Sequence, residues 1–549
     1  MRFNPRKSRF IISILLVGSL ASATFITSND RLFEIAKSLD IYASVFKELN
    51  KYYVDEVDPN KAMQTSVDAL LKSFDPYTVF YPADELEDFM LMTTGKYQGI
   101  GIQLSEINHQ HHITFIESES PAEKSGLQIG DQLVAVNDIR LSEKNEADPA
   151  QLMKSAANAP LVLEIQRPGA PNTQRITLTR STVQIKNVTF AGIIQPGVGY
   201  IQLDEFNASA AKEMKNALVS LKQQGMKSLI LDLRNNPGGL LTQAIDICNL
   251  FLPKGSKIVE TRGKIEEWNK SYSGLNTSFD TETPLAVLIN RNSASAAEIV
   301  AGVLQDYDRA VILGQKSYGK GLVQVTRDLP FQTKIKITTA KYYTPSGRCI
   351  QAVEYKNGSA IIHADSTNRI FLTKNGRKVV DGGGITPDQI IQKAQQVPFV
   401  YALLKQYKLY LYAVAYRIKN PTIRPAGQFE LTSSDIADFE KWLAQSDFTY
   451  ENAIQSQVKS LLEATEKDPT YAALHQSLQA AKASEKLALH QEIQSNQAEL
   501  KQLLSEEIIL HYYLQKGVNQ WATGHDPVIK AGVELVQNPR VYNSILTSK

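Results

Sequence analysis

The spacing of apolar residues changes along the chain, and each change predicts a different kind of structure. Over 29–94 apolar positions recur at the period of a helix, whereas 95–181 breaks into short alternating stretches typical of strands. Over 182–394 continuous apolar strands alternate with helical stretches, and 395–549 carries charge-rich helical patterns without clear strands. A chain of 549 residues is too long for one compact core, so these four ranges are the expected domains.

The third of these ranges has the most regular order. Strands are expected at 228–233, 285–289 and 310–314, and helices near 209–224, 239–251 and 295–306. This alternation predicts an α/β layered core. No catalytic signature stands out after residue 395, so the last range is expected to be a helical accessory region for assembly or substrate handling.

The first 28 residues have the form of an export signal. Basic residues between Arg2 and Arg9 precede an apolar run that begins at Phe10. Residues 21–23 fit the small-x-small cleavage pattern, but the apolar stretch reaches Ile26 and can also serve as an uncleaved membrane anchor. Both outcomes place the bulk of the protein outside the cytoplasm, either periplasmic or tethered to the cytoplasmic membrane and facing outward.

Net charge and cysteine content restrict the expected partners and the number of possible disulfides. The formal net charge is +2, which gives no reason to expect a nucleic acid partner. The two cysteines, Cys248 and Cys349, can form at most one disulfide. Cys248 lies in an apolar helical stretch, where it is expected to be a small buried side chain.

Ser295 is the first candidate for chemistry, because it lies where the strand at 285–289 gives way to a helix. The free N–H groups and the positive dipole end of such a helix can stabilise an oxyanion. The spacing Ser295-x-x-Glu298 also forms a capping box, which is the commonest reason for a serine at a helix start. Ser295 alone therefore does not establish a nucleophile.

A serine nucleophile needs a base, and the distribution of histidine restricts the choice. None of the eight histidines lies between residues 182 and 350, so a Ser-His-Asp triad within that segment is excluded, although a histidine outside it can still fold over it. Burial can lower the pKa of a lysine until it serves as a base. Lys320 is the candidate. Gln324, four residues later on an expected strand, would face the same side and orient the amine.

Other interpretations of Lys320 stay open at this point. It can be a solvated turn lysine, and Lys316 competes for the same role. The segment from Gly314 to Lys320 also nearly matches a phosphate-binding loop. However, Gly321 stands where that loop needs Ser or Thr, and a strand rather than a helix is expected to follow, so nucleotide binding is disfavoured.

The range 95–181 resembles a PDZ domain, a small partly open β-barrel. The resemblance rests on Gly-Ile-Gly-Ile at 99–102 and on Ser-Pro-Ala-x-x-Ser-Gly-Leu-x-x-Gly-Asp at 120–131. It implies that backbone N–H groups bind the carboxylate of a protein tail while that tail adds a strand. The residues of the implied binding loop are Gly99, Ile100, Gly101 and Ile102. The alternative is that these glycines only mark a tight bend.

From Tyr52 to Pro387 the chain resembles the C-terminal processing peptidases, or tail-specific proteases, which are S41-type serine peptidases with a PDZ domain. The motifs that carry the resemblance, besides the PDZ segment, lie at 53–55, 71–77, 231–239, 293–296, 318–321 and 343–348. The resemblance implies a crotonase-like α/β core, no metal or organic cofactor, and protein substrates with apolar C-terminal tails. It leaves a homo-oligomer and a membrane tether possible.

The same resemblance assigns roles to individual residues. The second serine of the Ser-Ala-Ser-Ala motif would be the nucleophile, with a lysine 25 residues later and a glutamine four beyond, as Ser295, Lys320 and Gln324 are spaced. The oxyanion hole would use the N–H groups of Ala296 and Gly238, the latter preferred over its neighbour Gly239. The family usually has another serine where this chain has Ala297, which removes a competitor.

A function of another class keeps the same fold without the chemistry. The protein would then be a non-catalytic PDZ scaffold or adaptor that binds protein C-termini. The presence of Ser295, Lys320 and Gln324 together argues against it, because a scaffold has no need of all three.

Overall fold

The computed structural model describes residues 30–547 except for 142–147, 154–158, 357, 363–368, 392–396, 452, 467–468 and 483–484. The expected export signal or anchor at 1–28 lies outside the described residues. No helix within the described part of the chain combines the length and the apolar character needed to cross a membrane.

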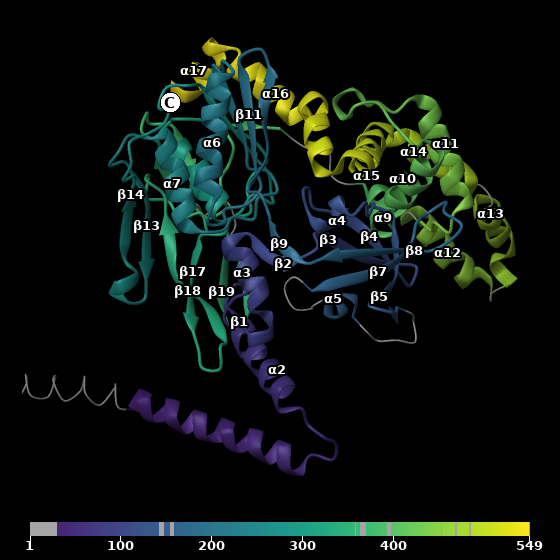
Figure 1. Ribbon diagram of the computed structural model, residues 1–549, viewed down its shortest axis with the longest axis horizontal. Coiled ribbons are helices and arrows are strands. Elements are labelled where there is room, and N and C mark those ends of the chain that lie inside the picture. Colours follow the sequence, from purple (N-terminus) through teal and green to yellow (C-terminus); the bar gives the residue numbers. More distant parts are fainter. Residues whose placement is uncertain are drawn as a thin grey trace, which may run out of the picture.

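The described chain begins with a helix over 30–52, which extends away from the rest of the protein (Figure 1). Two further helices follow, α2 (Pro59–Lys72) and α3 (Leu86–Thr94). Between them lies the strand β1 (Val79–Tyr81), which the helical period of this range does not anticipate. β1 pairs antiparallel with a strand of the core, and this pairing joins the N-terminal segment to the centre of the molecule.

The PDZ-like segment forms its own sheet and its own core. Its elements are β2 (Lys96–Gly99), β3 (Ile102–Ile107), β4 (Gln110–Ile116), α4 (Pro121–Lys124), β5 (Gln132–Val136), β6 (Ile139–Arg140), α5 (Pro149–Leu152), β7 (Pro160–Gln166), β8 (Gln174–Thr179) and β9 (Ser181–Gln184). The main sheet has the order β3-β4-β5-β7-β8, and β3 lies at its edge. Alternate residues of β7 are buried, as the period of a strand requires.

The centre of the molecule is a six-stranded sheet that is parallel from its second strand onward. Its order is β10 (Val188–Gln195), β11 (Val198–Leu203), β12 (Ser228–Asp232), β15 (Leu285–Ile289), β16 (Val311–Gly314) and β23 (Gln389–Ile390). Three helices connect these strands: α6 (Ala210–Gln223), α7 (Leu241–Phe251) and α8 (Ala296–Asp306). The strands and helices expected between 209 and 314 are therefore confirmed.

The two faces of this sheet are buried by different parts of the chain. Leu229 and Leu231 of β12 pack in one cluster with α6, α7 and α8, whereas Ile230 between them packs in a second cluster. That second cluster includes residues of α16 (Pro527–Val536) and α17 (Pro539–Thr547), which return to the core from the C-terminus (Figure 1). Both faces being covered explains why the strands read as continuous apolar runs.

A second sheet flanks the core and contains β1. It has the order β1, β18 (Lys334–Tyr343), β13 (Lys257–Gly263) and β14 (Lys270–Ser273), with β17 (Leu322–Asp328) also paired to β18. Two small hairpins follow it in sequence, β19 (Val353–Lys356) with β20 (Ser359–Ile362), and β21 (Ile370–Leu372) with β22 (Lys378–Val380). Both cysteines are free, and Cys248 is fully buried as expected.

In the described part of the chain after β23 the regular elements are all helices, joined by turns and loops. Its helices before α16 are α9 (Pro398–Lys405), α10 (Lys408–Lys419), α11 (Ser433–Gln445), α12 (Ala453–Glu466), α13 (Ala472–Lys482), α14 (Glu485–Ser495) and α15 (Gln497–His525). They bury a cluster of their own that includes Phe399, Phe439 and Trp521. α15 ends at the core, where α16 begins.

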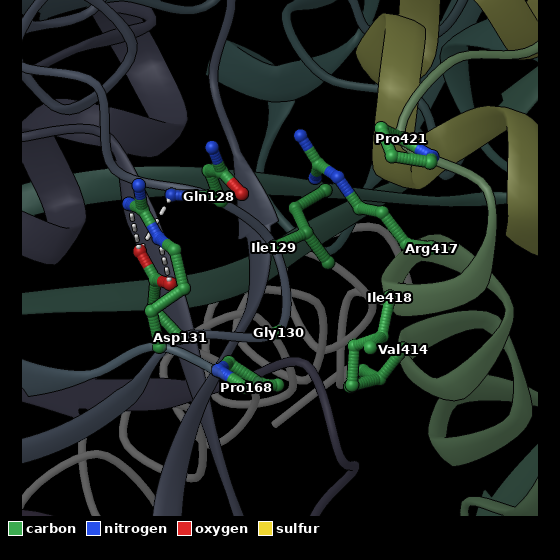
Figure 2. Close-up of a pocket in the computed structure, with 10 residues that line it drawn as sticks. Gln128, Ile129, Gly130, Asp131, Pro168, Val414, Arg417, Ile418 and Pro421 are labelled. Atoms are coloured by element: carbon green, nitrogen blue, oxygen red, sulfur yellow. Dashed lines mark hydrogen bonds and ion pairs between the residues drawn. The ribbon is translucent and has the colours of Figure 1, made fainter. Parts of the chain in front are cut away.

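Helix α10 also contacts the PDZ-like segment. Tyr410 is buried in that segment's core, and its hydroxyl donates to the carbonyl of Ile113 at 3.1 Å. Beside this contact lies a pocket of about 260 Å³, where Val414 and Ile418 of α10 face the turn at Gly130 (Figure 2). The pocket contains none of the residues that the sequence marks as catalytic or tail-binding.

Candidate active site

Ser295 lies at the N-cap of α8, directly after the segment that leaves β15. Its backbone has φ 55° and ψ −114°, a conformation that residues with a side chain rarely adopt. Such a conformation costs about 1–3 kcal/mol and persists only where surrounding contacts enforce it. Every residue of α8 is buried, so the helix is a rigid base for the strained serine.

Glu298 is the contact that holds this strained turn. Its side chain is fully buried, and its Oε2 accepts a hydrogen bond from the backbone nitrogen of Ser295 at 2.9 Å. The same carboxylate accepts from the hydroxyl of Ser317 at 2.5 Å and from the backbone nitrogens of Gly319 at 2.7 Å and Lys320 at 2.9 Å. Glu298 is thus more than a helix cap, because it binds the Ser295 turn and the Lys320 loop to each other.

Tyr342 joins the same two segments from the other side. Its buried hydroxyl lies 2.8 Å from the carbonyl of Lys320 and 3.3 Å from the carbonyl of Ser295. In addition, the backbone nitrogen of Tyr318 donates to the carbonyl of Ser293 at 3.0 Å. The two candidate motifs therefore lie side by side, as the proposed nucleophile–base pair requires.

Lys320 is largely withdrawn from solvent, and its Nζ lies 4.4 Å from the centre of the Tyr77 ring. Burial is the main cause that lowers the pKa of this amine, to about 8, and the positive charge of Lys336 lowers it further. The carboxylates of Glu298 and Asp75 oppose this shift. With a pKa of about 8, roughly one amine in ten is neutral at pH 7, which is suitable for a general base.

Lys320 and Gln324 do not lie on one strand, contrary to the expectation. Lys320 lies in the loop before β17, which begins at Leu322, and an irregularity in the β17–β18 register falls between Val323 and Gln324. The amide nitrogen of Gln324 donates to Thr338 Oγ1 at 3.2 Å. Within the described part of the chain, no hydrogen bond joins Lys320 Nζ to Gln324 or to Ser295.

The loop that would complete an oxyanion hole lies against Ser295. A Cβ atom on Gly238 would lie 2.8 Å from the backbone nitrogen of Ala296, so only glycine permits this approach, and φ is 99°. The N–H of Gly238 donates to Oδ1 of Asn236 at 2.8 Å. Among the described residues, no acceptor binds the N–H of Gly239 or that of Ala296. The available donors in this conformation are therefore Ala296 and Gly239 rather than Gly238.

The expected tail-binding loop connects β2 to the edge strand β3. Gly99 ends β2, Ile102 begins β3, and Ile100 is buried in the PDZ-like core. The carbonyls of Ile100 and Gly101 accept hydrogen bonds from Ala122 and Glu117, both at 2.9 Å. In the described sheet β3 has β4 as its only neighbour, which leaves its other edge open to an added strand.

Four residues of this site have no role in the sequence interpretation: Tyr77, Asn236, Tyr342 and, beyond its cap, Glu298. Tyr77 and Tyr342 lie inside or beside motifs that carry the family resemblance, and this is the signal in the sequence that could have pointed to them. Their contacts depend on pairing between distant strands, which a single sequence does not reveal.

Three family models match the chain. The model described as peptidase family S41 matches residues 197–358, the model of a PDZ domain matches 112–167, and the model described as probable PDZ-protease, C-terminal helical domain, matches 399–536. These matches identify a PDZ domain, a peptidase domain and a C-terminal helical domain in one chain. The segment before the PDZ domain is matched by none of the three.

Curated relatives and a solved structure are similar over much of the chain. A carboxy-terminal-processing protease of Bartonella bacilliformis is 32% identical over 349 residues, which are 63% of this chain and 80% of that protein. A carboxyl-terminal-processing protease of Synechocystis sp. is 38% identical over 302 residues, covering 54% and 70% respectively. The solved photosystem II D1 C-terminal processing protease is 27% identical, covers 64% of this chain and 92% of that one, and has a TM-score of 0.34.

Proposed function

The chain belongs to the carboxy-terminal-processing proteases of peptidase family S41 and is a serine peptidase, and on this premise we propose that it cleaves with a Ser295–Lys320 dyad. The observation that carries the proposal is the shared carboxylate of Glu298, which binds the backbone of both residues. The lowered pKa of Lys320 and the strained backbone of Ser295 add support, because a base needs a neutral amine and a nucleophile needs an exposed, fixed oxygen.

In the proposed reaction, neutral Lys320 takes the proton of the Ser295 hydroxyl as the serine oxygen bonds to the scissile carbonyl carbon. The carbonyl electrons move to oxygen, and N–H groups of Ala296 and of the Gly238–Gly239 turn stabilise that charge. The tetrahedral intermediate collapses, the protonated lysine returns the proton to the leaving amine, and an acyl-enzyme remains. Water activated by the same lysine then releases the product and restores the serine.

No hydrogen bond joins Lys320 and Ser295 among the described contacts, so the proposed proton transfer requires their side chains to come together first. Both side chains are partly exposed, and the proposal assigns this approach to rotation about side-chain bonds. We include Gln324 as the residue that orients the amine. Gln324 lies on β17, and its amide now donates to Thr338 of the neighbouring strand β18, so it would have to exchange this bond for one to the amine.

We also propose that the PDZ domain binds the substrate's C-terminal tail through Gly99, Ile100, Gly101 and Ile102. The open edge of β3 and the engaged carbonyls of this loop support the proposal, because they leave the N–H groups to face an incoming carboxylate. Tails with apolar ends are the proposed substrates. The same proposal includes export by residues 1–28, domain limits at 94, 181 and 394, and a crotonase-like arrangement of the core.

The test compares purified Ser295→Ala and Lys320→Ala with wild type on a disordered polypeptide that ends in apolar residues. Each substitution should lower kcat by about 10³-fold or more, because the pair acts as a unit. Lys316→Ala is the matched control, since Lys316 lies four residues before Lys320 and should leave kcat unchanged. Wild-type cleavage by Lys320→Ala, or an equal loss in the control, would refute the dyad. Tail binding by the wild type without any turnover would instead identify the scaffold.

A further inference from the structure

A turn from the N-terminal segment, Asp75 to Thr78, forms one wall of the site around Lys320. Tyr77 presents the face of its ring to the Lys320 amine, with 4.4 Å between Nζ and the ring centre. An aromatic face attracts a cation through its quadrupole, and the attraction grows when water is excluded. Lys320 is only partly exposed, and the Tyr77 ring lies in contact with the charge that would form on the amine.

The turn is rigid, so the position of the ring is fixed. Oδ1 of the buried Asp75 accepts from the backbone nitrogens of Tyr77 and Thr78, both at 2.8 Å. Its Oδ2 accepts from the hydroxyl of Thr78 at 3.0 Å. The chain continues directly into β1, whose Val79 pairs with Lys336 of β18.

Two further tyrosines hold the Tyr77 ring itself. Tyr355 packs edge-on against it, with ring centres 6.0 Å apart and an interplanar angle of 88°. The hydroxyl groups of Tyr355 and Tyr318 each lie 3.4 Å from the Tyr77 hydroxyl. The ring therefore cannot turn away from Lys320 without breaking contacts on its edge and at its tip.

The same turn also reaches Gln324. The Thr78 hydroxyl lies 3.4 Å from that of Thr338 and accepts from the Thr338 backbone nitrogen at 3.3 Å. Thr338 Oγ1 in turn accepts from the amide of Gln324 at 3.2 Å. One turn thus contacts the amine of Lys320 directly and Gln324 through a single threonine.

We propose that Tyr77 is a positioning residue of this peptidase, which seats the Lys320 amine on its ring face and stabilises the ammonium formed when the amine takes the Ser295 proton. The inference rests on the proposed role of Lys320 as base. A carboxylate in contact with the amine would keep it protonated, whereas a ring gives weaker stabilisation and leaves the neutral form accessible. The charged groups that face Lys320 are Lys336, Glu298 and Asp75, besides the Tyr77 ring itself.

The experiment measures kcat, KM and the pH dependence of kcat for Tyr77→Leu and Tyr77→Phe on the disordered polypeptide with an apolar tail. Leucine keeps the site apolar but removes the ring face, so kcat should fall about tenfold with little change in KM. Loss of ring stabilisation disfavours the ammonium and lowers the pKa of Lys320, so the acidic limb of the profile should move to lower pH. Tyr77→Phe keeps the ring and should leave that limb in place.

Phe74→Leu is the matched control, because Phe74 is an exposed aromatic residue three positions earlier and should have no effect. Replacement of Tyr77 by pentafluorophenylalanine preserves ring shape and inverts the quadrupole, so it should move the limb as leucine does even if Tyr77→Leu does not fold. The inference would be overturned if Tyr77→Leu and the pentafluorophenylalanine variant both lowered kcat but left the acidic limb of the pH profile in place. If Lys320→Ala is inactive and the Tyr77 variants behave as wild type, only this inference is refuted. If Lys320→Ala is active, the proposed dyad itself is refuted.

Discussion

The backbone nitrogens of Ser295 and Lys320 lie at equal distances, 2.9 Å, from one oxygen atom, Oε2 of the buried Glu298. Nucleophile and base candidates are thereby fixed to each other through main-chain contacts, so their relative position does not depend on their own side chains. The arrangement explains how a strained serine turn and a glycine-flanked lysine loop hold one geometry.

Glu298→Gln should disable the enzyme although it changes only one atom of the side chain. The carboxylate accepts from four donors, whereas an amide offers one acceptor oxygen and turns its NH₂ toward N–H groups. Unsatisfied buried donors cost about 1–3 kcal/mol each, so we expect kcat to fall by about 10²-fold and Tm to fall with it. Steady-state cleavage and thermal unfolding measure the two effects. Glu267→Gln, at an exposed position, is the control, and normal turnover by Glu298→Gln would show that the shared contact is dispensable.

The pH dependence of kcat should report the ionisation of Lys320. The proposed base, Lys320, can act only when its amine is neutral, and its pKa is about 8, so kcat should rise with pH between 6 and 9 and reach half of its maximum near pH 8. Lys336 lowers this pKa by charge repulsion, so Lys336→Gln should raise the pKa and move the limb to higher pH. A limb that stays in place in Lys336→Gln would mean that another group titrates.

Two glycines of the PDZ domain allow a matched test of tail binding. Gly101 and Gly126 have nearly the same φ, 83° and 80°, but a Cβ on Gly101 would lie 2.3 Å from Ser120 Cβ, whereas one on Gly126 meets no atom within 4 Å. Both alanine variants carry the strain of a positive φ, about 1 kcal/mol. Only Gly101→Ala should raise KM, by about tenfold, because it deforms the proposed carboxylate-binding loop.

Substrates test the same loop without altering the protein. A polypeptide whose C-terminus is amidated should show a raised KM with wild type, and little further increase with Gly101→Ala. Equal KM values for the free and amidated tails would exclude carboxylate recognition by this loop, whatever the variants show.

The sequence predicted the elements of the core and the place of Ser295, because these depend on local period. Buried strands such as β15 are continuous apolar runs, and α8 begins where the cap residues predict it. The orientation of Lys320 was not predictable in this way. Gly319 and Gly321 both flank it, and a Cβ on Gly321 would lie 2.8 Å from the Gln351 nitrogen, so the strand begins only after this close contact.

The walls of the site depend on long-range pairing, which a single sequence does not display. Tyr77 reaches Lys320 because the three residues of β1 pair with β18, and three residues are too few to show alternation. The side chain of Asn236 accepts the hydrogen bond of the Gly238 N–H. From the spacing of two residues alone, this contact cannot be distinguished from an ordinary turn. Gly239 is therefore the better donor candidate in this conformation, contrary to the preference drawn from the motif.

The C-terminal helical domain also reaches the loop at 234–239, through Asp526. Its Oδ2 lies 2.8 Å from a terminal nitrogen of Arg234, the residue with which the 234–239 loop begins. Its Oδ1 caps α16 by accepting from the backbone nitrogens of Val528 at 2.8 Å and Ile529 at 3.0 Å. Arg234 is held from its other side by the buried Asp232. Asp526 therefore makes two contacts, the cap of α16 and the ion pair with Arg234. Different substitutions of Asp526 can remove one of them or both.

Asp526→Asn should keep the cap, since asparagine is an equally good N-cap, but should lose the charged bond to Arg234. We expect Tm to change little and kcat to fall by about three- to tenfold, because one hydrogen bond to a charged group contributes about 1.5–3 kcal/mol, of which only part reaches the loop. Asp526→Ala removes both contacts and should lower Tm as well. Asp58→Asn, at a cap of α2 that forms no ion pair among the described residues, should change neither quantity. If Asp526→Asn turns over at the wild-type rate, α16 only covers the sheet. A lowered kcat at unchanged Tm and KM would make the helical domain part of the loop's support, since the fold and substrate binding would both be intact.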